Sequence, residues 1–392
     1  MTSTSFHARS SVMPIPVNTP LLNGRERELL IECIETGWIS SEGPFVSRFE
    51  EEFSRRVGRK YGVAVANGSA ALDVAVQALR LGPGDEVIMP SFTIISPAAS
   101  VVRTGATPVL VDSDQVTWNM DVAQVESRIT PRTRAILVVH IYGLPTDMDP
   151  LLKMAQQHRL ALIEDAAEMH GQTYRGRPCG SFGDASIFSF YPNKHVTTGE
   201  GGMVVTDDPA LAERCRSLRN LCFQPARRFV HEELGWNYRM TNLQAALGLA
   251  QLERLDEFVK RKRAMGRRYT ELLAKLPGVQ LPLVKTEYAE NIYWVYGLVL
   301  NDNVSMNAAE TMHQLAKVGI GTRPFFWPMH EQPVFRRMGF FRDLHLPVSS
   351  RIARRGFYIP SGLGLGEEEI DRTASELAFV LATKEPSDDV PA

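Results

Sequence analysis

The run Ser189-Phe190-Tyr191-Pro192-Asn193-Lys194-His195-Val196-Thr197-Thr198-Gly199-Glu200-Gly201-Gly202 carries a lysine in a setting that few lysines have. The apolar residues at 185–188 just before it are typical of a buried strand, so Lys194 lies in the turn that follows. Gly201 and Gly202 leave room beside that turn. A fixed amine next to open space is what a lysine needs to form a Schiff base with a carbonyl ligand. A surface lysine in a glycine-rich turn is the ordinary alternative for such a run on its own.

Two more polar residues stand at the ends of strand candidates. Asp165 lies in Ile163-Glu164-Asp165-Ala166-Ala167, and Ser189 directly follows the candidate at 185–188. An aspartate at a strand end can pair with the pyridinium nitrogen of pyridoxal phosphate and keep the ring an electron sink, and a hydroxyl can bind the phosphate. Together with Lys194, these residues indicate pyridoxal phosphate as the cofactor.

Short apolar runs alternate with longer amphipathic stretches from about residue 60 onward. This alternation predicts an α/β fold with a mostly parallel sheet, whose ligands gather at the carboxyl ends of the strands. Helices are predicted over 70–81 and 148–158. The predicted strands are 62–65, 86–89, 108–111, 135–139, 161–163, 185–188 and 203–206.

Composition excludes several classes of protein. The formal net charge of −2 over 392 residues gives no basic surplus for nucleic acid, and no run approaches the length of a membrane span. The four cysteines are scattered without a C-x-x-C pair, so we expect reduced thiols and neither a disulfide framework nor a metal site. We therefore expect a soluble, cytoplasmic protein.

The chain divides into four expected parts: a flexible lead-in (1–20), a large cofactor-binding domain (21–255), a small C-terminal domain (256–383) and a flexible tail (384–392). A long helical pattern over 241–273 is expected to bridge the two domains. In the small domain, the predicted elements are a strand at 295–300 and helices at 308–318 and 367–381.

Gly68 and Ser69 follow the first strand and begin a helix. Gly68 allows a close approach of the backbone, Ser69 can cap the helix, and the unpaired N–H groups of a first helical turn bind anions. Such a joint usually binds nothing. Beside Lys194, however, it predicts a phosphate cradle for the same cofactor.

Several runs, in order along the chain, resemble the motifs of the DegT/DnrJ/EryC1/StrS family of sugar aminotransferases, and the resemblance extends from about Leu21 to the last helix. The runs are 67–69, 82–91, 164–168, 193–202, 235–241 and 322–324 with His330. The resemblance implies the type I fold of aspartate aminotransferase, in which a large α/β domain and a small α+β domain form a homodimer with shared active sites.

The resemblance also assigns roles to matching positions. Lys194 would carry the cofactor and later move protons, Asp165 would pair with the pyridine nitrogen, and Glu168 would lie near the ring hydroxyl. The phosphate would be held by Ser189, Gly68 and Ser69, with Asn237 reaching it from the neighbouring subunit.

Three further positions match the substrate side of the family site. They are Arg239, Arg323 and His330. The alternative for Arg239 is a structural ion pair, and the alternative for His330 is a packing role. Two positions depart from the family pattern. Ile94 stands where relatives usually carry an aromatic residue that stacks on the cofactor ring. The ring contact is therefore expected from Phe92, from another neighbour or from an aliphatic side chain. Trp327 replaces smaller or polar residues.

The resemblance is strongest to the branch that aminates C4 of GDP-4-keto-6-deoxymannose with L-glutamate, in a ping-pong scheme serving deoxysugar and surface-glycan biosynthesis. One alternative is an aminotransferase for another nucleotide-linked keto sugar. A second is a sugar dehydratase, in which histidine replaces the lysine; counting back from Thr198-Gly199-Glu200 places the catalytic position at Lys194 and not at His195. A third is a catalytically idle regulator with the same fold.

Overall fold

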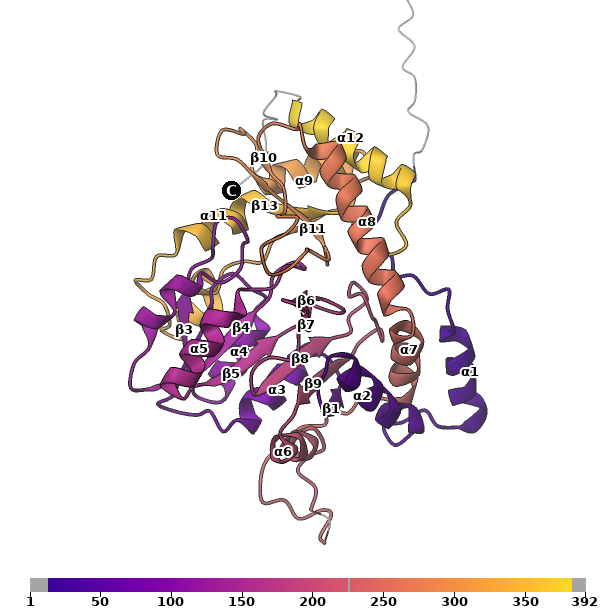
Figure 1. Ribbon diagram of the computed structural model, residues 1–392, viewed down its shortest axis with the longest axis vertical. Coiled ribbons are helices and arrows are strands. Elements are labelled where there is room, and N and C mark those ends of the chain that lie inside the picture. The colour runs from indigo at the N-terminus through magenta and orange to yellow at the C-terminus, as the bar shows by residue number, and fades with distance from the viewer. Residues whose placement is uncertain (1–12, 225, 383–392) are drawn as a thin grey trace, which may run out of the picture.

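The computed structural model describes residues 13–224 and 226–382, and the chain folds around two sheets (Figure 1). The larger sheet has seven strands in the order β1-β9-β8-β5-β4-β2-β3, and the smaller has four in the order β10-β11-β13-β12. Two very short strands, β6 (Thr173–Tyr174) and β7 (Arg177–Pro178), pair with each other.

The large sheet confirms the predicted mostly parallel α/β architecture. Neighbours from β3 through β8 pair in parallel, and β9 runs antiparallel between β8 and β1. All seven predicted strands are present, each within two residues of its expected bounds. The strands are β1 (Tyr61–Val65), β2 (Glu86–Pro90), β3 (Thr107–Val111), β4 (Thr133–Val139), β5 (Ala161–Asp165), β8 (Ala185–Ser189) and β9 (Gly202–Thr206).

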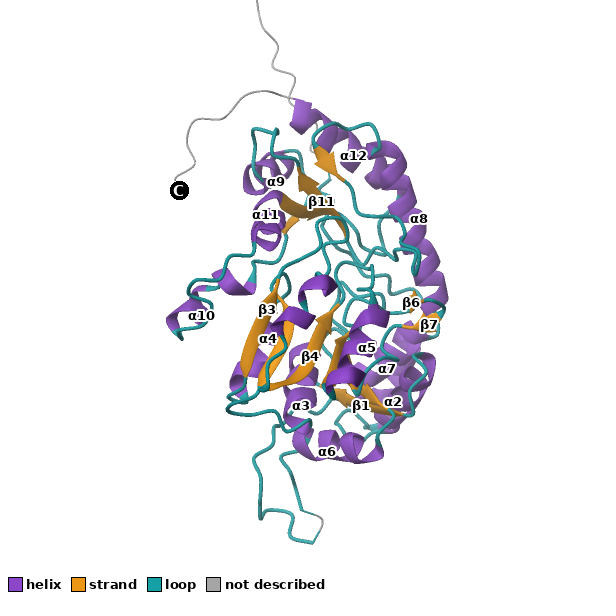
Figure 2. Ribbon diagram, turned by 60° about the vertical axis from the view of Figure 1, so that its left-hand side comes forward, coloured by secondary structure: helices purple, strands orange, loops and turns teal. Residues whose placement is uncertain are grey.

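Helices cover both faces of this sheet, as Figure 2 shows. Because strand residues point alternately to the two faces, Val63 packs in one apolar layer and Ala64 in the other. One face is covered by α3 (Gly68–Ala78), α4 (Ser96–Arg103) and α6 (Pro209–Arg219). The other is covered by α1 (Glu26–Thr36), α2 (Pro44–Arg56), α5 (Met148–His158) and α7 (Asn242–Leu252).

The helical pattern over 241–273 is two helices and not one. Helix α7 ends at Leu252, and α8 (Leu255–Leu273) begins after a two-residue turn. Thr241 starts α7 with a capping box, in which its hydroxyl accepts the backbone N–H of Gln244. The turn redirects the chain, because α7 packs against α1 and α2 whereas α8 runs up to the small sheet beside the last helix (Figure 1).

The small sheet is antiparallel throughout and carries its own apolar core. Its strands are β10 (Val279–Gln280), β11 (Tyr296–Leu300), β12 (Arg323–Pro324) and β13 (Gly356–Ile359). The helices in this part of the chain are α9 (Ala308–Lys317), α10 (Pro333–Arg337), α11 (Pro347–Arg355) and α12 (Glu367–Ala382), with a short 3-10 helix at Met329–Glu331. Two further 3-10 helices, Val122–Gln124 and Glu126–Arg128, lie between β3 and β4 of the large sheet.

The expected flexible ends fall mostly outside the described residues, which exclude 1–12 and 383–392. Residues 13–20 are described, and they differ from the expected lead-in because they are bound to the small sheet. The buried Ile15 pairs with Ile320, donating its N–H to the carbonyl of Gly319 and accepting the N–H of Gly321. The domain boundary near residue 255 remains a proposal.

No helix in residues 13–224 and 226–382 combines the length and the apolar character that crossing a bilayer requires.

Candidate active site

Lys194 lies in the turn after β8, where its backbone N–H donates to the carbonyl of Tyr191 at 2.9 Å. Its side chain is 9% exposed, and Nζ is 3.8 Å from Oε1 of Glu168. The amine also lies over the indole ring of Trp294, whose centroid is 3.7 Å from Nζ. Burial lowers the pKa of Lys194, and the carboxylates of Glu168 and Asp165 act in the opposite direction.

Two buried carboxyl groups stand beside this lysine. Asp165 is the last residue of β5, and its Oδ1 accepts the N–H of Ala167 at 3.1 Å. Glu168 follows on the next turn, and its Oε2 accepts the N–H of Tyr142 at 2.6 Å. Burial raises the pKa of both groups, against the lowering effect of Lys194. The site therefore holds two acids and one amine that compete for protons, and all three side chains are largely shielded from bulk solvent.

A cavity of about 590 Å³ opens at the carboxyl ends of the strands. Six of the ten predicted site residues line it: Gly68, Ser69, Asp165, Glu168, Ser189 and Lys194. They meet because Asp165 and Ser189 end the parallel neighbours β5 and β8, and because α3 starts where β1 ends. This is the position at which open α/β sheets bind ligands.

The first turn of α3 forms one wall of the cavity. Asn67 caps the helix by accepting the N–H of Ala70 at 2.8 Å, and Ser69 Oγ lies 2.6 Å from Ser96 Oγ. Gly68 has to be glycine here, because a Cβ would stand 2.7 Å from the Cβ of Ser189. The helix N-terminus and three hydroxyls thus surround a position suited to a phosphate.

These residues fit pyridoxal phosphate. A lysine amine, a buried carboxylate at a strand end and a helix N-terminus with hydroxyls all line one cavity, as the three functional groups of the cofactor require. The donors come from segments far apart in the chain, and the close packing at Gly68 leaves the helix N-terminus directly beside Ser189.

His195 lies next to Lys194 but does not line this cavity. It is 1% exposed, and burial lowers its pKa well below the usual value. The structure therefore places the lysine, and not the histidine, in the position that the motif spacing indicates.

Asn237 and Arg239 lie outside the cavity of their own chain. Asn237 is exposed and its backbone pairs with Asn220, whereas Arg239 donates to Oδ1 of Asn220 at 2.7 Å and pairs through its backbone with Val65. Within one chain, neither residue contacts the Lys194 site.

Arg323 borders an annex of about 250 Å³ that shares four lining residues with the main cavity. The shared residues are Tyr191, Asn193, Trp294 and Tyr358. Arg323 is exposed, and its guanidinium donates to the carbonyl of Thr322 at 3.0 Å. A guanidinium close to the lysine cavity is consistent with the substrate role proposed for it.

His330 is placed differently from its expected substrate role. It is 2% exposed and lines neither cavity; Nδ1 is 2.7 Å from Oγ of Ser91, and Nε2 is 3.2 Å from Oγ of Ser350. Both ring nitrogens are thus engaged, and these contacts favour the packing alternative.

The two departures from the family pattern lie in different places. Ile94 is 48% exposed and lines the cavity, whereas Phe92 is fully buried against Tyr142 and does not. The cavity therefore has an aliphatic side chain at this position. Trp327 lies outside the cavity, under the guanidinium of Arg354 at 5.0 Å.

Sequence reasoning missed the aromatic wall of the cavity, formed by Trp294, Phe326 and Tyr358. Trp294 lies two residues before β11, and the other two lie in or near β12 and β13, far from Lys194 in the chain. No short motif marks them, because their proximity results from the packing of the small sheet against the large one.

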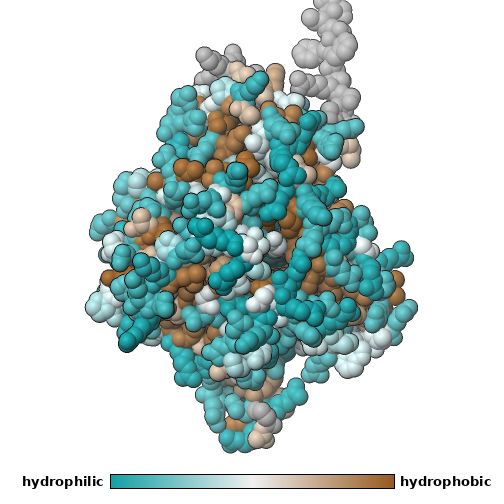
Figure 3. Space-filling view, viewed as in Figure 1, coloured by the Kyte–Doolittle hydropathy of each residue, from teal (hydrophilic) through white to brown (hydrophobic). Residues whose placement is uncertain are grey.

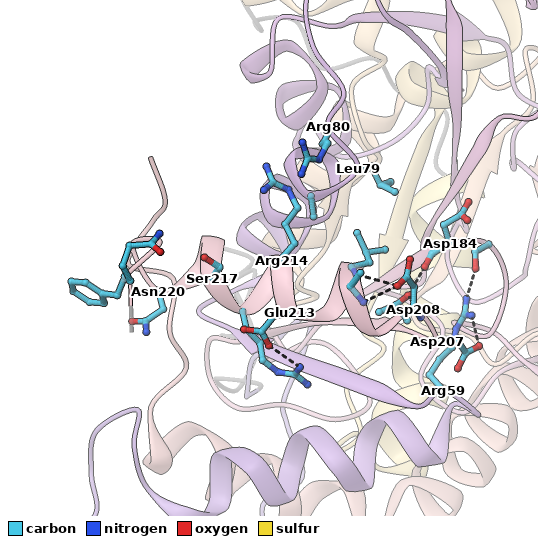
Figure 4. Close-up of a pocket in the computed structure, with 18 residues that line it drawn as sticks. Arg59, Leu79, Arg80, Asp184, Asp207, Asp208, Glu213, Arg214, Ser217 and Asn220 are labelled. Carbon is cyan, nitrogen blue, oxygen red and sulfur yellow. Dashed lines mark hydrogen bonds and ion pairs between the residues drawn. The ribbon is translucent and has the colours of Figure 1, made fainter. Parts of the chain in front are cut away.

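A larger cavity, of about 1080 Å³, lies under α6 (Figure 4). Several of its charged groups are engaged with one another or with the backbone: Arg59 pairs with Asp207 at 2.9 Å, and Asp208 caps α6 by accepting the N–H of Ala210. No lysine lines it, so it offers no comparable chemistry.

His140, Glu164 and Cys179 are buried together with ligand atoms within 4.8 Å of one another. Glu164 accepts hydrogen bonds from His140, Gly180, Phe182 and Ser186. His140 Nδ1 accepts the N–H of Thr146, so Nε2 is the ring nitrogen that donates to Glu164.

A family model described as the DegT/DnrJ/EryC1/StrS aminotransferase family matches residues 20–378. The chain belongs to this family. It is 44% identical to a "GDP-perosamine synthase" of Caulobacter vibrioides over 95% of this chain and all of the relative.

Two solved structures superpose closely on this member of the DegT/DnrJ/EryC1/StrS family. The PLP form of the putative sugar aminotransferase Spr1654 from Streptococcus pneumoniae covers 94% of this chain and 98% of its own, with a TM-score of 0.88 and 26% identity. DesI, solved with its TDP-sugar product, covers 94% and 93%, with a TM-score of 0.85 and 34% identity. The predictions of an aminotransferase, of its fold and of its cofactor are confirmed.

Proposed function

We propose that this aminotransferase transfers an amino group from L-glutamate to C4 of a nucleotide-linked 4-keto-6-deoxyhexose, with GDP-4-keto-6-deoxymannose as the favoured substrate and GDP-perosamine as its product. The observation that carries the amino-transfer chemistry is the single cavity shared by Lys194, Asp165 and the N-terminus of α3. The choice of sugar nucleotide is supported by the 44% identity to a GDP-perosamine synthase over the full length of that relative.

Bound pyridoxal phosphate supplies an electron sink for charge that develops on the carbon being aminated. Asp165, as a carboxylate, would hold the proton on the ring nitrogen. Its burial makes this pairing strong, since a buried carboxylate lacks competing water. Gly68, Ser69 and Ser189 would hold the phosphate and thereby fix the ring relative to Lys194.

Lys194 is placed to carry protons during the reaction. Burial lowers its pKa, which increases the fraction of neutral amine near neutral pH, and a neutral amine can act as a base. Glu168 lies 3.8 Å from Nζ, and burial raises its pKa, so it is a partner with which Lys194 could exchange a proton.

We further propose a homodimer in which Asn237 and Arg239 complete the site of the neighbouring subunit. The segment before them, residues 221–224 and 226–236, includes a part that projects beyond α6 (Figures 1 and 2), and its Phe229 (80%) and Leu234 (89%) are exposed. Apolar side chains that project this far into solvent support contact with a second copy. Further apolar residues, including Ile34 (69% exposed), lie on and near α1, on a face where Figure 3 shows hydrophobic side chains among polar ones.

The substrate is tested by incubating purified protein and L-glutamate with GDP-, dTDP- and UDP-linked 4-keto-6-deoxyhexoses and identifying the products by mass spectrometry. We expect an amino sugar from the GDP compound, and amination at C4 by NMR. The Lys194→Ala variant should lose activity by about 10³-fold or more, since the covalent attachment and the proton carrier are both removed. Lys153→Ala, at an exposed lysine of α5, is the matched control and should remain active.

Each outcome of this panel is informative. Amination of the dTDP or UDP compound alone would contradict the proposed nucleotide and retain the reaction. Loss of the keto sugar without incorporation of nitrogen would indicate a dehydratase. No reaction with any sugar, although the protein binds pyridoxal phosphate, would favour the idle regulator.

A further inference from the structure

The indole of Trp294 contacts two consecutive residues of the turn that carries the cavity lysine. Its Nε1–H donates to the carbonyl of Asn193 at 2.9 Å, and its ring centroid lies 3.7 Å from Nζ of Lys194. One side chain thus holds the backbone before the lysine and also covers the end of the lysine side chain.

Trp294 is itself held firmly. Its carbonyl accepts a hydrogen bond from Nζ of Lys262 at 2.8 Å, and the same Nζ donates to the carbonyl of Ser361. Lys262 lies on α8, is 2% exposed and has no ion pair with a described carboxylate. Leaving a lysine buried with only carbonyl partners is costly. These two hydrogen bonds from Lys262 join the segment before β11 to the segment after β13.

Neighbouring rings fix the orientation of the indole. Phe326 lies nearly parallel to it, with centroids 6.5 Å apart and an interplanar angle of 17°, and Tyr142 lies 5.8 Å away at 33°. With 4% of its surface exposed, Trp294 has little freedom to turn. Its face toward Lys194 is therefore preset and does not depend on a ligand.

We propose that Trp294 is a positioning residue: its ring face holds the free ammonium group of Lys194 inside the cavity, its indole N–H fixes the turn at Asn193, and Lys262 fixes Trp294. The inference rests on the proposed role of Lys194 and adds residues that no motif marks. A lysine side chain has several rotatable bonds, so an amine that is not covalently attached loses its alignment unless something holds it. A ring face attracts the ammonium and not the neutral amine, so the contact also favours the charged form.

The test measures the pKa of Lys194 in Trp294→Phe and Trp294→Leu. Both substitutions remove the hydrogen bond to Asn193, but only Phe keeps a ring face. The full-length protein is loaded with pyridoxamine 5′-phosphate, which leaves the lysine amine free, and is labelled with trace acetic anhydride over a range of pH. Acetylation of Lys194 is then quantified by peptide mass spectrometry. We expect the pKa to be lower in the Leu variant than in the Phe variant by about 0.5 or more.

A second measurement keeps the shape of the protein unchanged. Tryptophan is replaced throughout by fluorinated analogues, which retain the N–H and weaken the attraction of the ring for a cation. Among the described residues, Trp294 is the tryptophan whose ring faces a lysine. The pKa of Lys194 should fall stepwise with each added fluorine, whereas that of Lys153 should stay constant.

The titratable groups around Lys194 that could also respond are Asp165, Glu168, His170 and His195. They are identical in all of these proteins, so they do not produce the expected difference. Equal pKa values in the Phe and Leu variants, with no trend on fluorination, would overturn the inference. Failure of the wild-type protein to bind pyridoxamine 5′-phosphate would instead contradict the proposed function.

Discussion

At the scale of single residues, Glu168 shows how burial determines charge in this site. The side chain lies 3.8 Å from Nζ of Lys194, but the larger effect is desolvation, which raises its pKa to about 8. The group thus binds its proton more tightly in the folded chain than in the unfolded chain, where a glutamate titrates near its ordinary value.

This shift predicts how the stability of the cofactor-free protein depends on pH. Between about pH 4.5 and pH 8 the folded state holds a proton on Glu168 that the unfolded state has lost, so this contribution to stability is present at low pH and is lost as the pH rises. In the wild-type protein, this effect should lower the free energy of unfolding by about 1 kcal/mol per pH unit between pH 5 and 7. Glu168→Gln should abolish this pH dependence. Urea unfolding at several pH values measures this slope.

The matched control is Glu51→Gln, at an exposed glutamate of α2, which should leave the slope unchanged. A slope in Glu168→Gln equal to that of the wild-type protein would mean that Glu168 is already ionised in the folded state at pH 5.

The predicted site residues that line the cavity share one property. Lys194, Asp165, Ser189 and Gly68 follow or end strands of one sheet, so alternation along the chain suffices to bring them together. The position of Trp294 depends instead on how the small sheet packs over the large one, which no local pattern reports. His330 matched a family position, but two serines of its own chain engage its ring.

At the scale of secondary structure elements, those with a clear local sequence pattern were predicted, and those that depend on tertiary packing were not. Strands of the large sheet were predictable because burial on both faces gives continuous apolar runs. Helices α1, α2, α4, α6, α10 and α11 were missed. The short strands β6, β7, β10, β12 and β13 were also missed, because two to four residues carry too little periodic signal. The break between α7 and α8 was also missed, because both sides of it have helical spacing and the change of direction is imposed by tertiary packing.

The joint between β1 and α3 yields a prediction at this scale. Gly68→Ala places a Cβ 2.7 Å from the Cβ of Ser189, so the first turn of α3 or the end of β8 has to move. We expect the dissociation constant for pyridoxal phosphate to rise about tenfold or more, which is ~1.4 kcal/mol, as measured by fluorescence titration of the cofactor-free protein.

A second glycine provides the control for that experiment. Gly366→Ala, just before α12, meets no atom closer than 3.6 Å and should leave cofactor affinity unchanged. If the two variants bind the cofactor equally well, the close approach at Gly68 does not shape the phosphate position.

At the scale of the whole molecule, two of the predicted site residues, Asn237 and Arg239, do not line the cavity of their own chain. Asn237 and Arg239 adjoin the edge strand β1 through the pairing of Arg239 with Val65, and they follow the segment that projects beyond α6 (Figure 2). A two-fold dimer would present this segment from each chain to the other. A structural role for Arg239 within its own chain, through Asn220, is the alternative.

Mixed dimers distinguish these two arrangements. Lys194→Ala and the double variant Asn237→Ala/Arg239→Ala should each be inactive as homodimers. A verified heterodimer of the two has one site that combines an intact Lys194 from one chain with an intact loop from the other, so about half of the wild-type activity per dimer should return. Heterodimers of Lys194→Ala with the wild-type chain calibrate that half value. If the mixed dimers form, melt like the wild-type protein and still have no activity, each loop serves its own subunit, because in that arrangement every site contains one of the substitutions.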